Sequence, residues 1–175
     1  MTAGSWVAGA AILCIAGAGQ ADEPRVTVTA GGGYGGVTEN VLCLDGQSGC
    51  GEESPATSVL VGVGLLSAAG RGLRGGMRIE GALGFGQGRG HHADLIAVAG
   101  WQGLHVVSEI GFGGSVVWGA GPSPRRRELG RLLHAGLGVR LGPSLNLLAR
   151  LDLLPTENMM GTFAGLALEW QPWAP

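Results

Sequence analysis

The stretch over residues 131–154 constrains the fold most, because it contains two period-two runs joined by a short turn. In each run, apolar residues alternate with residues that are mostly polar or glycine. The apolar members of the first run are Leu133, Ala135, Leu137, Val139 and Leu141, and those of the second are Leu145, Leu147, Ala149, Leu151 and Leu153. Successive side chains on a β-strand point to opposite faces, so each run has one wholly apolar face. The stretch therefore predicts a β-hairpin.

The turn sets the register of this hairpin. Facing residues on paired strands lie on the same side of the sheet, which here requires an odd number of turn residues. The Gly-Pro-Ser segment at 142–144 supplies three. Leu141 then faces Leu145, and counting outward places His134 opposite Asp152. The polar face of the hairpin thus carries plausible cross-strand pairs.

Composition limits the class of protein. A chain of 175 residues fits one domain, and its net charge of -2 favours neither a nucleic acid nor an acidic substrate as partner. Charged residues make up only 14%, against roughly 25% in an ordinary soluble domain. The 36 glycines show no three-residue period, so collagen is excluded, and so much glycine disfavours long helices. Strands and turns are the expected elements.

The first 21 residues predict a secretory signal peptide. An apolar run over residues 6–18 precedes Gly19-Gln20-Ala21, which fits a small-x-small cleavage site. A buried or anchoring N-terminal helix is the alternative. We therefore expect a signal peptide over residues 1–21, which includes Cys14, and a barrel domain over residues 22–175. Cys43 and Cys50 then remain, and an even pair in one loop of an exported protein predicts a disulfide.

The rest of the chain repeats the alternating pattern. Strands are expected over residues 25–37, 58–66, 77–86, 95–101, 105–118 and 162–170, in addition to the two of the hairpin. Glycine-rich turns are expected over residues 69–76 and at Gln102-Gly103. Long polar loops follow the first, third, fifth and seventh strands, and shorter turns follow the others. The predicted fold is all-β, an eight-stranded antiparallel up-and-down meander.

Alternation leaves two architectures open, a soluble lipocalin-like ligand-binding barrel with an apolar lumen and a transmembrane barrel with an apolar exterior. If the polar faces met water, the surface would be mostly Gly, Ala and Ser, with about one charged residue per strand. Such a surface is too bare for a soluble protein. We therefore expect the ionised side chains to fill the lumen as an ion network, comprising Arg78, Glu80, Glu109, His134, Arg140, Arg150, Asp152 and Glu169.

Aromatic residues independently favour the membrane barrel. They fall near the strand ends, as two interfacial girdles would require: Tyr34, Phe85, Trp118 and Phe163 at the loop end, and Trp101 and Trp170 at the turn end. Beyond the signal, the sequence has no run of about 18 uncharged apolar residues that would predict a spanning helix. Lipid offers no hydrogen-bond partners, so all backbone N–H and C=O groups of the strands must pair within the protein. The first strand should therefore pair with the eighth.

With this pattern the chain resembles the small eight-stranded bacterial outer-membrane β-barrels of the OmpA and OmpX type, over nearly its whole predicted mature length. One departure is the segment Gln171-Pro172-Trp173-Ala174-Pro175, because such barrels often finish on a terminal aromatic residue. The resemblance implies an outer-membrane location, contact with outer-membrane lipid, insertion by the barrel-insertion machinery and a monomer. Roles in the family include membrane integrity, adhesion and, in a few members, lipid-modifying catalysis.

Two histidine-containing groups raise the question of catalysis. His134 with Asp152 and Arg150 could form an acid-base pair, but no serine nucleophile is placed with it, and a structural ion network explains it as well. His105 and Ser108 are similar to the His and Ser of lipid-A deacylase barrels, but their spacing places them on opposite faces of a strand. We therefore expect a structural or surface-interaction role and no enzyme activity, with a lipid-modifying enzyme as the alternative.

Two loop segments could bind ligands. His91, His92 and Asp94 could hold a metal, but adjacent histidines diverge in an extended chain, so a solvated loop is favoured. The arginines at 125–127 could contact lipopolysaccharide phosphates through charge-assisted hydrogen bonds, again with a solvated loop as the favoured alternative. The sequence has no P-loop, dinucleotide fingerprint or zinc-type spacing. We expect no cofactor and no metal.

Overall fold

The computed structural model of the chain describes residues 24–39, 56–67, 71–85, 90–118, 127–157 and 159–172. The described residues form eight β-strands: β1 (Pro24–Glu39), β2 (Ala56–Ser67), β3 (Gly72–Phe85), β4 (His91–Gln102), β5 (Val106–Trp118), β6 (Arg127–Arg140), β7 (Leu145–Pro155) and β8 (Met159–Trp170). None of the described residues forms a helix long and apolar enough to cross a membrane. The predicted signal peptide, the Cys43–Cys50 disulfide and Arg125 lie outside the described residues.

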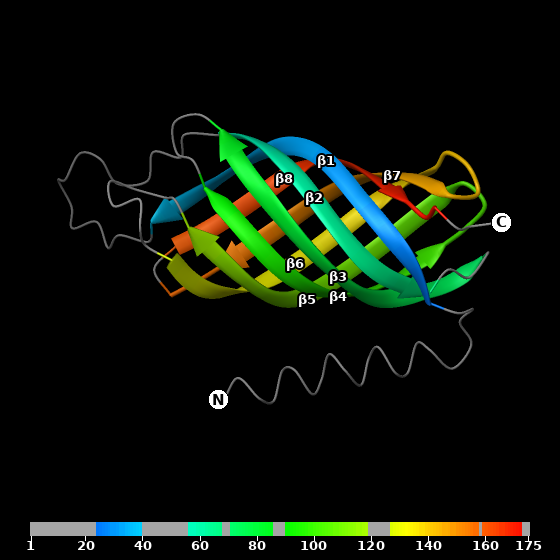
Figure 1. Cartoon of the computed structure of the whole chain (residues 1–175), viewed down its shortest axis with the longest axis horizontal. Coiled ribbons are helices and arrows are strands. Elements are labelled where there is room, and N and C mark those ends of the chain that lie inside the picture. Colours follow the sequence, from blue (N-terminus) through cyan, green and yellow to red (C-terminus); the bar gives the residue numbers. More distant parts are fainter. Residues whose placement is uncertain are drawn as a thin grey trace.

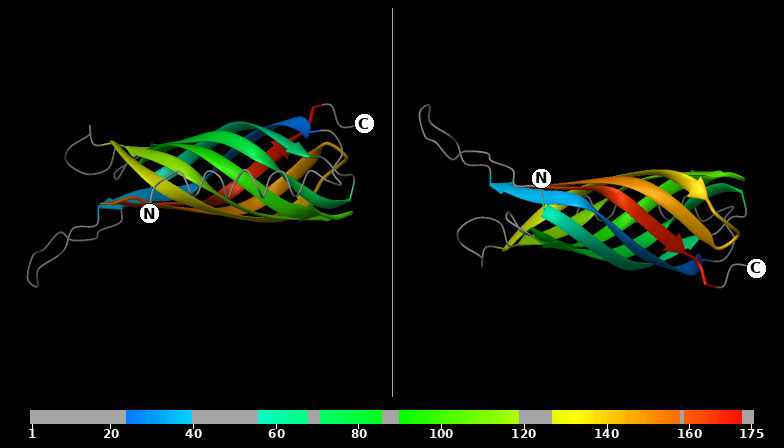
Figure 2. Two further views of the ribbon diagram at one scale, coloured as in Figure 1. Left: turned by 90° about the horizontal axis from the view of Figure 1, so that it is seen from below. Right: turned by 90° about the horizontal axis from the view of Figure 1, so that it is seen from above.

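The strands form a closed antiparallel barrel (Figures 1 and 2). Each strand pairs with its neighbours in sequence, and β1 also pairs with β8, from Val28 opposite Trp170 to Glu39 opposite Met159. The predicted meander and its closure are therefore confirmed. The connections after β1, β3, β5 and β7 leave one end of the barrel, which we call the loop end. Those after β2, β4 and β6 leave the other, the turn end.

The register predicted for the central hairpin is confirmed. His134 lies opposite Asp152 in the β6–β7 pair. The backbone N–H of Leu141 donates a hydrogen bond of 2.9 Å to the carbonyl oxygen of Leu145. Counting turn residues succeeded here because the apolar faces of both strands allow only registers that keep them on one side of the sheet.

Several strand boundaries differ from the prediction. The glycine-rich segment expected to be a turn over residues 69–76 lies mostly in β3, which begins at Gly72. A Cβ on Gly76 would overlap the carbonyl oxygen of Leu65, so this glycine permits close approach of β2 and β3 rather than marking a turn. β4 begins at His91, within the segment expected to be a loop. His105 precedes β5 and lies in the turn after β4.

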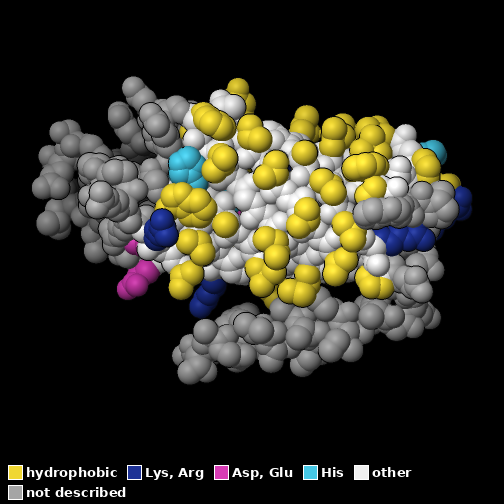
Figure 3. Space-filling view, viewed as in Figure 1, with side chains coloured by type: hydrophobic (Ala, Val, Ile, Leu, Met, Phe, Trp, Pro, Cys, Tyr) yellow, Lys and Arg dark blue, Asp and Glu magenta, His cyan; other side chains and the backbone are white. Residues whose placement is uncertain are grey.

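The outer surface of the strands is apolar (Figure 3). Ile79, Ile110 and Leu137 are 63%, 69% and 62% exposed, whereas the arginine and glutamate side chains on the inner face are buried. A soluble barrel with an apolar lumen would have the opposite arrangement. The structure therefore confirms the predicted inversion of polar and apolar faces.

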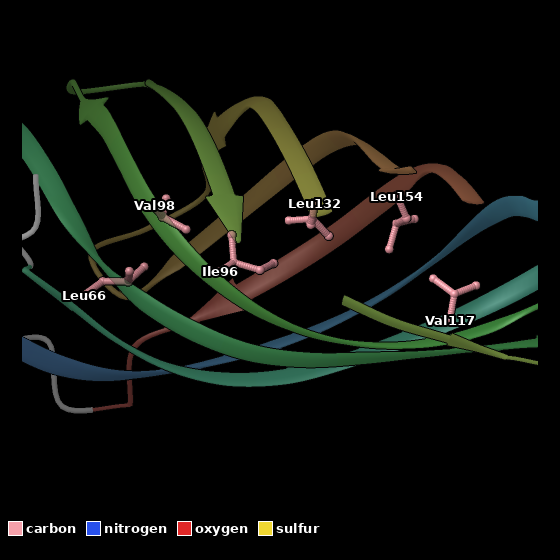
Figure 4. Close-up of a cluster of buried hydrophobic side chains, with 6 residues drawn as sticks. All are labelled: Leu66, Ile96, Val98, Val117, Leu132 and Leu154. Atoms are coloured by element: carbon pink, nitrogen blue, oxygen red, sulfur yellow. The ribbon is translucent and has the colours of Figure 1, made fainter. Parts of the chain in front are cut away.

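The lumen also contains apolar side chains, whereas the sequence analysis predicted only an ion network there. One buried cluster comprises Leu66, Ile96, Val98, Val117, Leu132 and Leu154 (Figure 4), and a second comprises Leu60, Ala82, Phe163 and Ala167. These residues come from seven strands, β2 to β8, whose inner positions are not all polar. Ions and apolar groups together fill the interior of the described barrel.

The predicted girdle of aromatic residues needs one correction. Tyr34, Phe85, Trp101 and Trp170 are all about half or more exposed on the outer surface, and Trp118 is half-buried beside His91. Phe163 is only 1% exposed and points into the lumen. In β8 the outward positions are even-numbered, so an odd-numbered residue faces inward whatever its distance from the strand end.

Candidate functional site: a charged cluster in the lumen

Charged side chains from five strands meet inside the barrel. β3 contributes Arg74, Arg78 and Glu80, β5 contributes Glu109, β6 His134, β7 Arg150 and Asp152, and β8 Glu169, and we call these eight residues the lumen ion cluster. Each side chain in it is 0 or 1% exposed. Ionised groups removed from water to this extent require close partners of opposite charge.

Two arginines of β3 share two glutamates from other strands. Arg74 Nη2 lies 2.6 Å from Glu169 Oε2 and 3.0 Å from Glu109 Oε2. Arg78 Nη2 donates to the same Glu109 oxygen and lies 3.1 Å from Glu169 Oε2. Because Arg74 and Arg78 lie four residues apart on one strand, both point inward, and the shared carboxylates connect β3 to β5 and β8.

Arg150 forms the second centre of the cluster. Its Nη1 and Nη2 donate to Glu80 Oε1 and Oε2 at 3.1 and 2.7 Å, which is the bidentate geometry suited to a guanidinium group. The same guanidinium donates to Asp152 Oδ2 from Nη2 at 2.8 Å. It also lies 5.9 Å from the centre of the Phe163 ring. The inward position of Phe163 therefore places an aromatic face beside a buried cation.

His134 connects two carboxylates. Its Nδ1 lies 2.6 Å from Asp152 Oδ1, and its Nε2 lies 2.9 Å from Glu109 Oε1. A neutral imidazole carries one N–H, so two ionised carboxylates at these distances require the imidazolium, which has two donors. Three arginines and one imidazolium then balance four carboxylates, and the cluster is electrically neutral.

Seven of the eight residues predicted for the ion network lie in this cluster. Arg140 differs, because it is half-buried near the turn end, where its guanidinium donates to the carbonyl oxygens of Gly142 and Pro143 at 3.1 and 3.2 Å. Arg74 was missed because its segment was expected to be a turn. Its period-two spacing from Arg78 and Glu80 was the signal that could have identified it.

A second buried pair lies closer to the loop end. His92 Nδ1 is 2.6 Å from Asp94 Oδ2, and both side chains lie on the inner face of β4. His91 points outward, with its ring 5.9 Å from the Trp118 ring, because neighbouring residues on a strand face opposite ways. Within the described residues, no group of three or more His, Cys, Asp or Glu could hold a metal ion.

The arrangement around the histidines gives little support to catalysis. Both ring nitrogens of His134 contact carboxylates, and its side chain is 0% exposed. Ser108 is on the outer face of β5, and His105 lies in the preceding turn. Within the part of the chain that the structure describes, neither His134 nor His105 forms the hydroxyl–imidazole hydrogen bond that an activated serine needs.

Comparisons with known proteins bear on the fold. No protein-family model and no curated protein matches the sequence. Among solved structures, Neisserial surface protein A aligns at 12% identity and a TM-score of 0.55, covering 83% of this chain and 96% of its own. The outer membrane enzyme PagL aligns at 15% identity and a TM-score of 0.54, covering 83% of this chain and 98% of its own. Ail, the attachment invasion locus protein of Yersinia pestis, aligns at 12% identity and a TM-score of 0.52, covering 85% of this chain and 99% of its own.

The chain has the fold of the small eight-stranded outer-membrane β-barrels. Within these outer-membrane barrels, one fold serves proteins of different kinds, since PagL is an enzyme and Ail is named for attachment and invasion. The role of this barrel must therefore be argued from its own residues.

Proposed function

We propose that the chain resides in the bacterial outer membrane as a closed, non-conducting barrel with a structural or surface-interaction role. The observation that carries the proposal is the distribution of side chains: apolar outside and, inside, a neutral ion cluster packed with two apolar clusters. An apolar exterior is stable only in lipid, and a lumen filled by protein leaves no continuous path for water.

The ion cluster serves a structural role in this proposal. It connects five strands that are not all adjacent in the barrel, through contacts such as Arg74 with Glu169 and Arg150 with Glu80. Removing one partner would leave a buried charge unpaired, which is costly. The cluster therefore favours one stagger of the strands over alternatives, which holds the barrel in a single closed form.

The loop end is the proposed interaction surface. Arg125 and Arg126 precede Arg127, which is exposed at the start of β6. Guanidinium groups in a row suit phosphate or sulfate groups, and lipopolysaccharide phosphates are the partner we propose. Ail, a structural neighbour at 13% identity and a TM-score of 0.51, has been solved in complex with the heparin analogue sucrose octasulfate. That polyanion supports the proposal by analogy of fold only.

Fractionation tests the proposed location. We expect the protein in the outer-membrane fraction, with a folded form that migrates differently on a gel before and after boiling. Reconstituted in planar bilayers, it should show no stable conductance steps. Recovery of the protein as a soluble periplasmic species would contradict the location, and steady single-channel currents would contradict the closed lumen.

Lipid-modifying catalysis is the alternative function, because the structural neighbour PagL is an outer membrane enzyme. The buried position of His134 argues against it, because a lipid headgroup cannot reach a side chain enclosed by the barrel wall. Mass spectrometry of lipid A from cells with and without the protein should show the same acylation pattern. A new lipid A species that disappears in a His134→Gln or Asp152→Asn variant would overturn the non-enzymatic proposal.

A further inference from the structure

The lipid-facing surface of the barrel is not uniformly covered by large side chains. An open hollow with a volume of about 740 Å³ extends over the outer wall from β3 across β4, β5 and β6 to β7, and its lining is mainly apolar. The strand pairing explains its position. Ala99 lies opposite Ile110, and Ile110 lies opposite Ala135, so small residues interrupt one outward row. Small side chains beside large ones leave a depression in the surface.

The adjacent row, nearer the turn end, has the complementary pattern. Trp101 lies opposite Ser108, Ser108 opposite Leu137, and Leu137 opposite Ala149. The indole of Trp101 lies against Gly103 in the turn, because a Cβ on that glycine would overlap the ring. The ring is therefore directed toward the turn, and Trp101 also lines the hollow.

The exposed charge at the turn end is basic. Arg71 is exposed two residues before Leu73, which lines the hollow. Among the described turn-end residues, the charged side chains that reach the surface are arginines, Arg25, Arg71 and Arg140, and Figure 3 shows arginine side chains at this end. The acidic side chains near this end, Glu109 and Glu169, are buried in the lumen. Basic residues at a membrane surface attract anionic headgroups.

We propose that this hollow holds the acyl chains of an anionic phospholipid, whose phosphate lies near Arg71. Short turns mark the periplasmic side of outer-membrane barrels, so the site faces the periplasmic leaflet. The inference rests on the proposed membrane location. It adds a lipid of defined charge at a defined place on the barrel wall.

Native mass spectrometry of the purified full chain in detergent, with added phosphatidylglycerol or phosphatidylethanolamine, tests the site. The wild type should retain phosphatidylglycerol preferentially. Filling the hollow with Ala135→Leu and Ala149→Leu should reduce retention of both lipids on the order of tenfold. The matched control places leucine at Ala30 and Ala93, two exposed outward alanines outside the hollow, and should bind as the wild type does.

The charge is tested separately. Arg71→Gln should lower the preference for phosphatidylglycerol about fivefold, whereas Arg131→Gln, at an exposed arginine of β6 outside the hollow, should leave it unchanged. Ser108→Val, a smaller change in the same hollow, should repeat the effect of the leucine pair if that pair folds poorly.

Three results would overturn the inference: filled variants that retain lipid like the wild type, a preference for phosphatidylglycerol that does not depend on Arg71, or a dimer that filling abolishes, since a second copy would then occupy the hollow. Heat-modifiable migration is measured for every sample. A wild type that fails this measurement contradicts the proposed function, whereas a folded barrel with unchanged lipid retention contradicts only the lipid site.

Discussion

At the scale of single residues, the stability of this barrel depends on partners that lie far apart in the chain. Arg150 and Glu80 are 70 residues apart in sequence, yet their side chains form a bidentate pair at 2.7 and 3.1 Å with no exposure to solvent. A buried pair of this kind adds little when intact compared with apolar groups of the same shape. Replacing one residue of the pair, however, leaves the buried charge of the other without this partner.

We therefore expect Glu80→Gln to destabilise the folded barrel by about 3 to 5 kcal/mol. Arg150→Met should cost a similar amount because it removes the bidentate partner of Glu80 and leaves only the 3.6 Å contact with Arg78 Nη1, and the double variant should cost less than the sum of the two. Urea unfolding in detergent micelles, followed by tryptophan fluorescence, measures these differences. Glu157→Gln, at an exposed glutamate, is the control. Strictly additive single effects would show that the pair is not coupled.

The outward residues of β6 give a second prediction at this scale. Leu133→Arg, in the middle of the strand, should cost about 2 to 4 kcal/mol because it places a charge near the bilayer midplane. Leu129→Arg, close to the loop end, should cost about 0 to 1 kcal/mol because the side chain can reach the interface. Both leucines are exposed, at 54% and 81%. Folding into liposomes at increasing urea measures the difference, and equal costs would contradict the assigned depth of β6.

At the scale of elements, glycine allows neighbouring strands to approach at the inner wall. A Cβ on Gly138 would overlap the carbonyl oxygen of Leu147 on β7, a backbone atom that cannot move without disturbing the strand pairing. A Cβ on Gly142, in the turn of the same hairpin, would meet no atom within 4 Å. The two glycines of one hairpin thus have different roles.

Gly138→Ala should consequently destabilise the barrel by about 1 to 3 kcal/mol, as overpacking commonly does. Gly142→Ala should be close to neutral, because the space is open and the backbone at Gly142 does not have a positive φ. Refolding yield and urea midpoints for the two variants provide the comparison. A neutral Gly138→Ala would mean that β6 and β7 separate more easily than the structure indicates.

At the scale of the whole molecule, closure between β1 and β8 converts a meander into a barrel without exposed sheet edges. Ala30 lies opposite Leu168 in this pair. Directly opposed residues of antiparallel strands have Cα atoms about 4.5 to 5.5 Å apart, within the range that a disulfide spans.

Cysteines introduced at Ala30 and Leu168, with Cys43 and Cys50 replaced by alanine, should therefore form a disulfide on oxidation of the folded protein. The control pair places cysteines at Ala30 and Leu133, on strands that are not paired, and should remain reduced. Mass spectrometry of the oxidised, digested chain identifies the crosslink. A folded barrel in which the first pair fails to form would contradict the closure of β1 on β8.

Much of this architecture was accessible from local pattern. Alternation identified eight strands, and the three-residue turn at 142–144 fixed His134 opposite Asp152, because period two and turn length act between residues that are near each other in sequence. The shortage of charge selected the apolar exterior. The starts of β3 and β4, near glycines and histidines, were harder to predict from the sequence, since a glycine such as Gly76 is compatible with close strand packing as well as with a turn.

What the sequence by itself determined is which residues share a face of each strand, and hence that one face must be placed in lipid. Only the tertiary structure decided the partners inside: Arg74 and Arg78 with Glu169, and Phe163 beside Arg150. The contacts of Arg74 and Arg78 with Glu169 cross the lumen between β3 and β8, which are not neighbours in the barrel, whereas Phe163 and Arg150 come from the paired strands β8 and β7. Their distances depend on closure and on the stagger of all eight strands, and no local period carries that information.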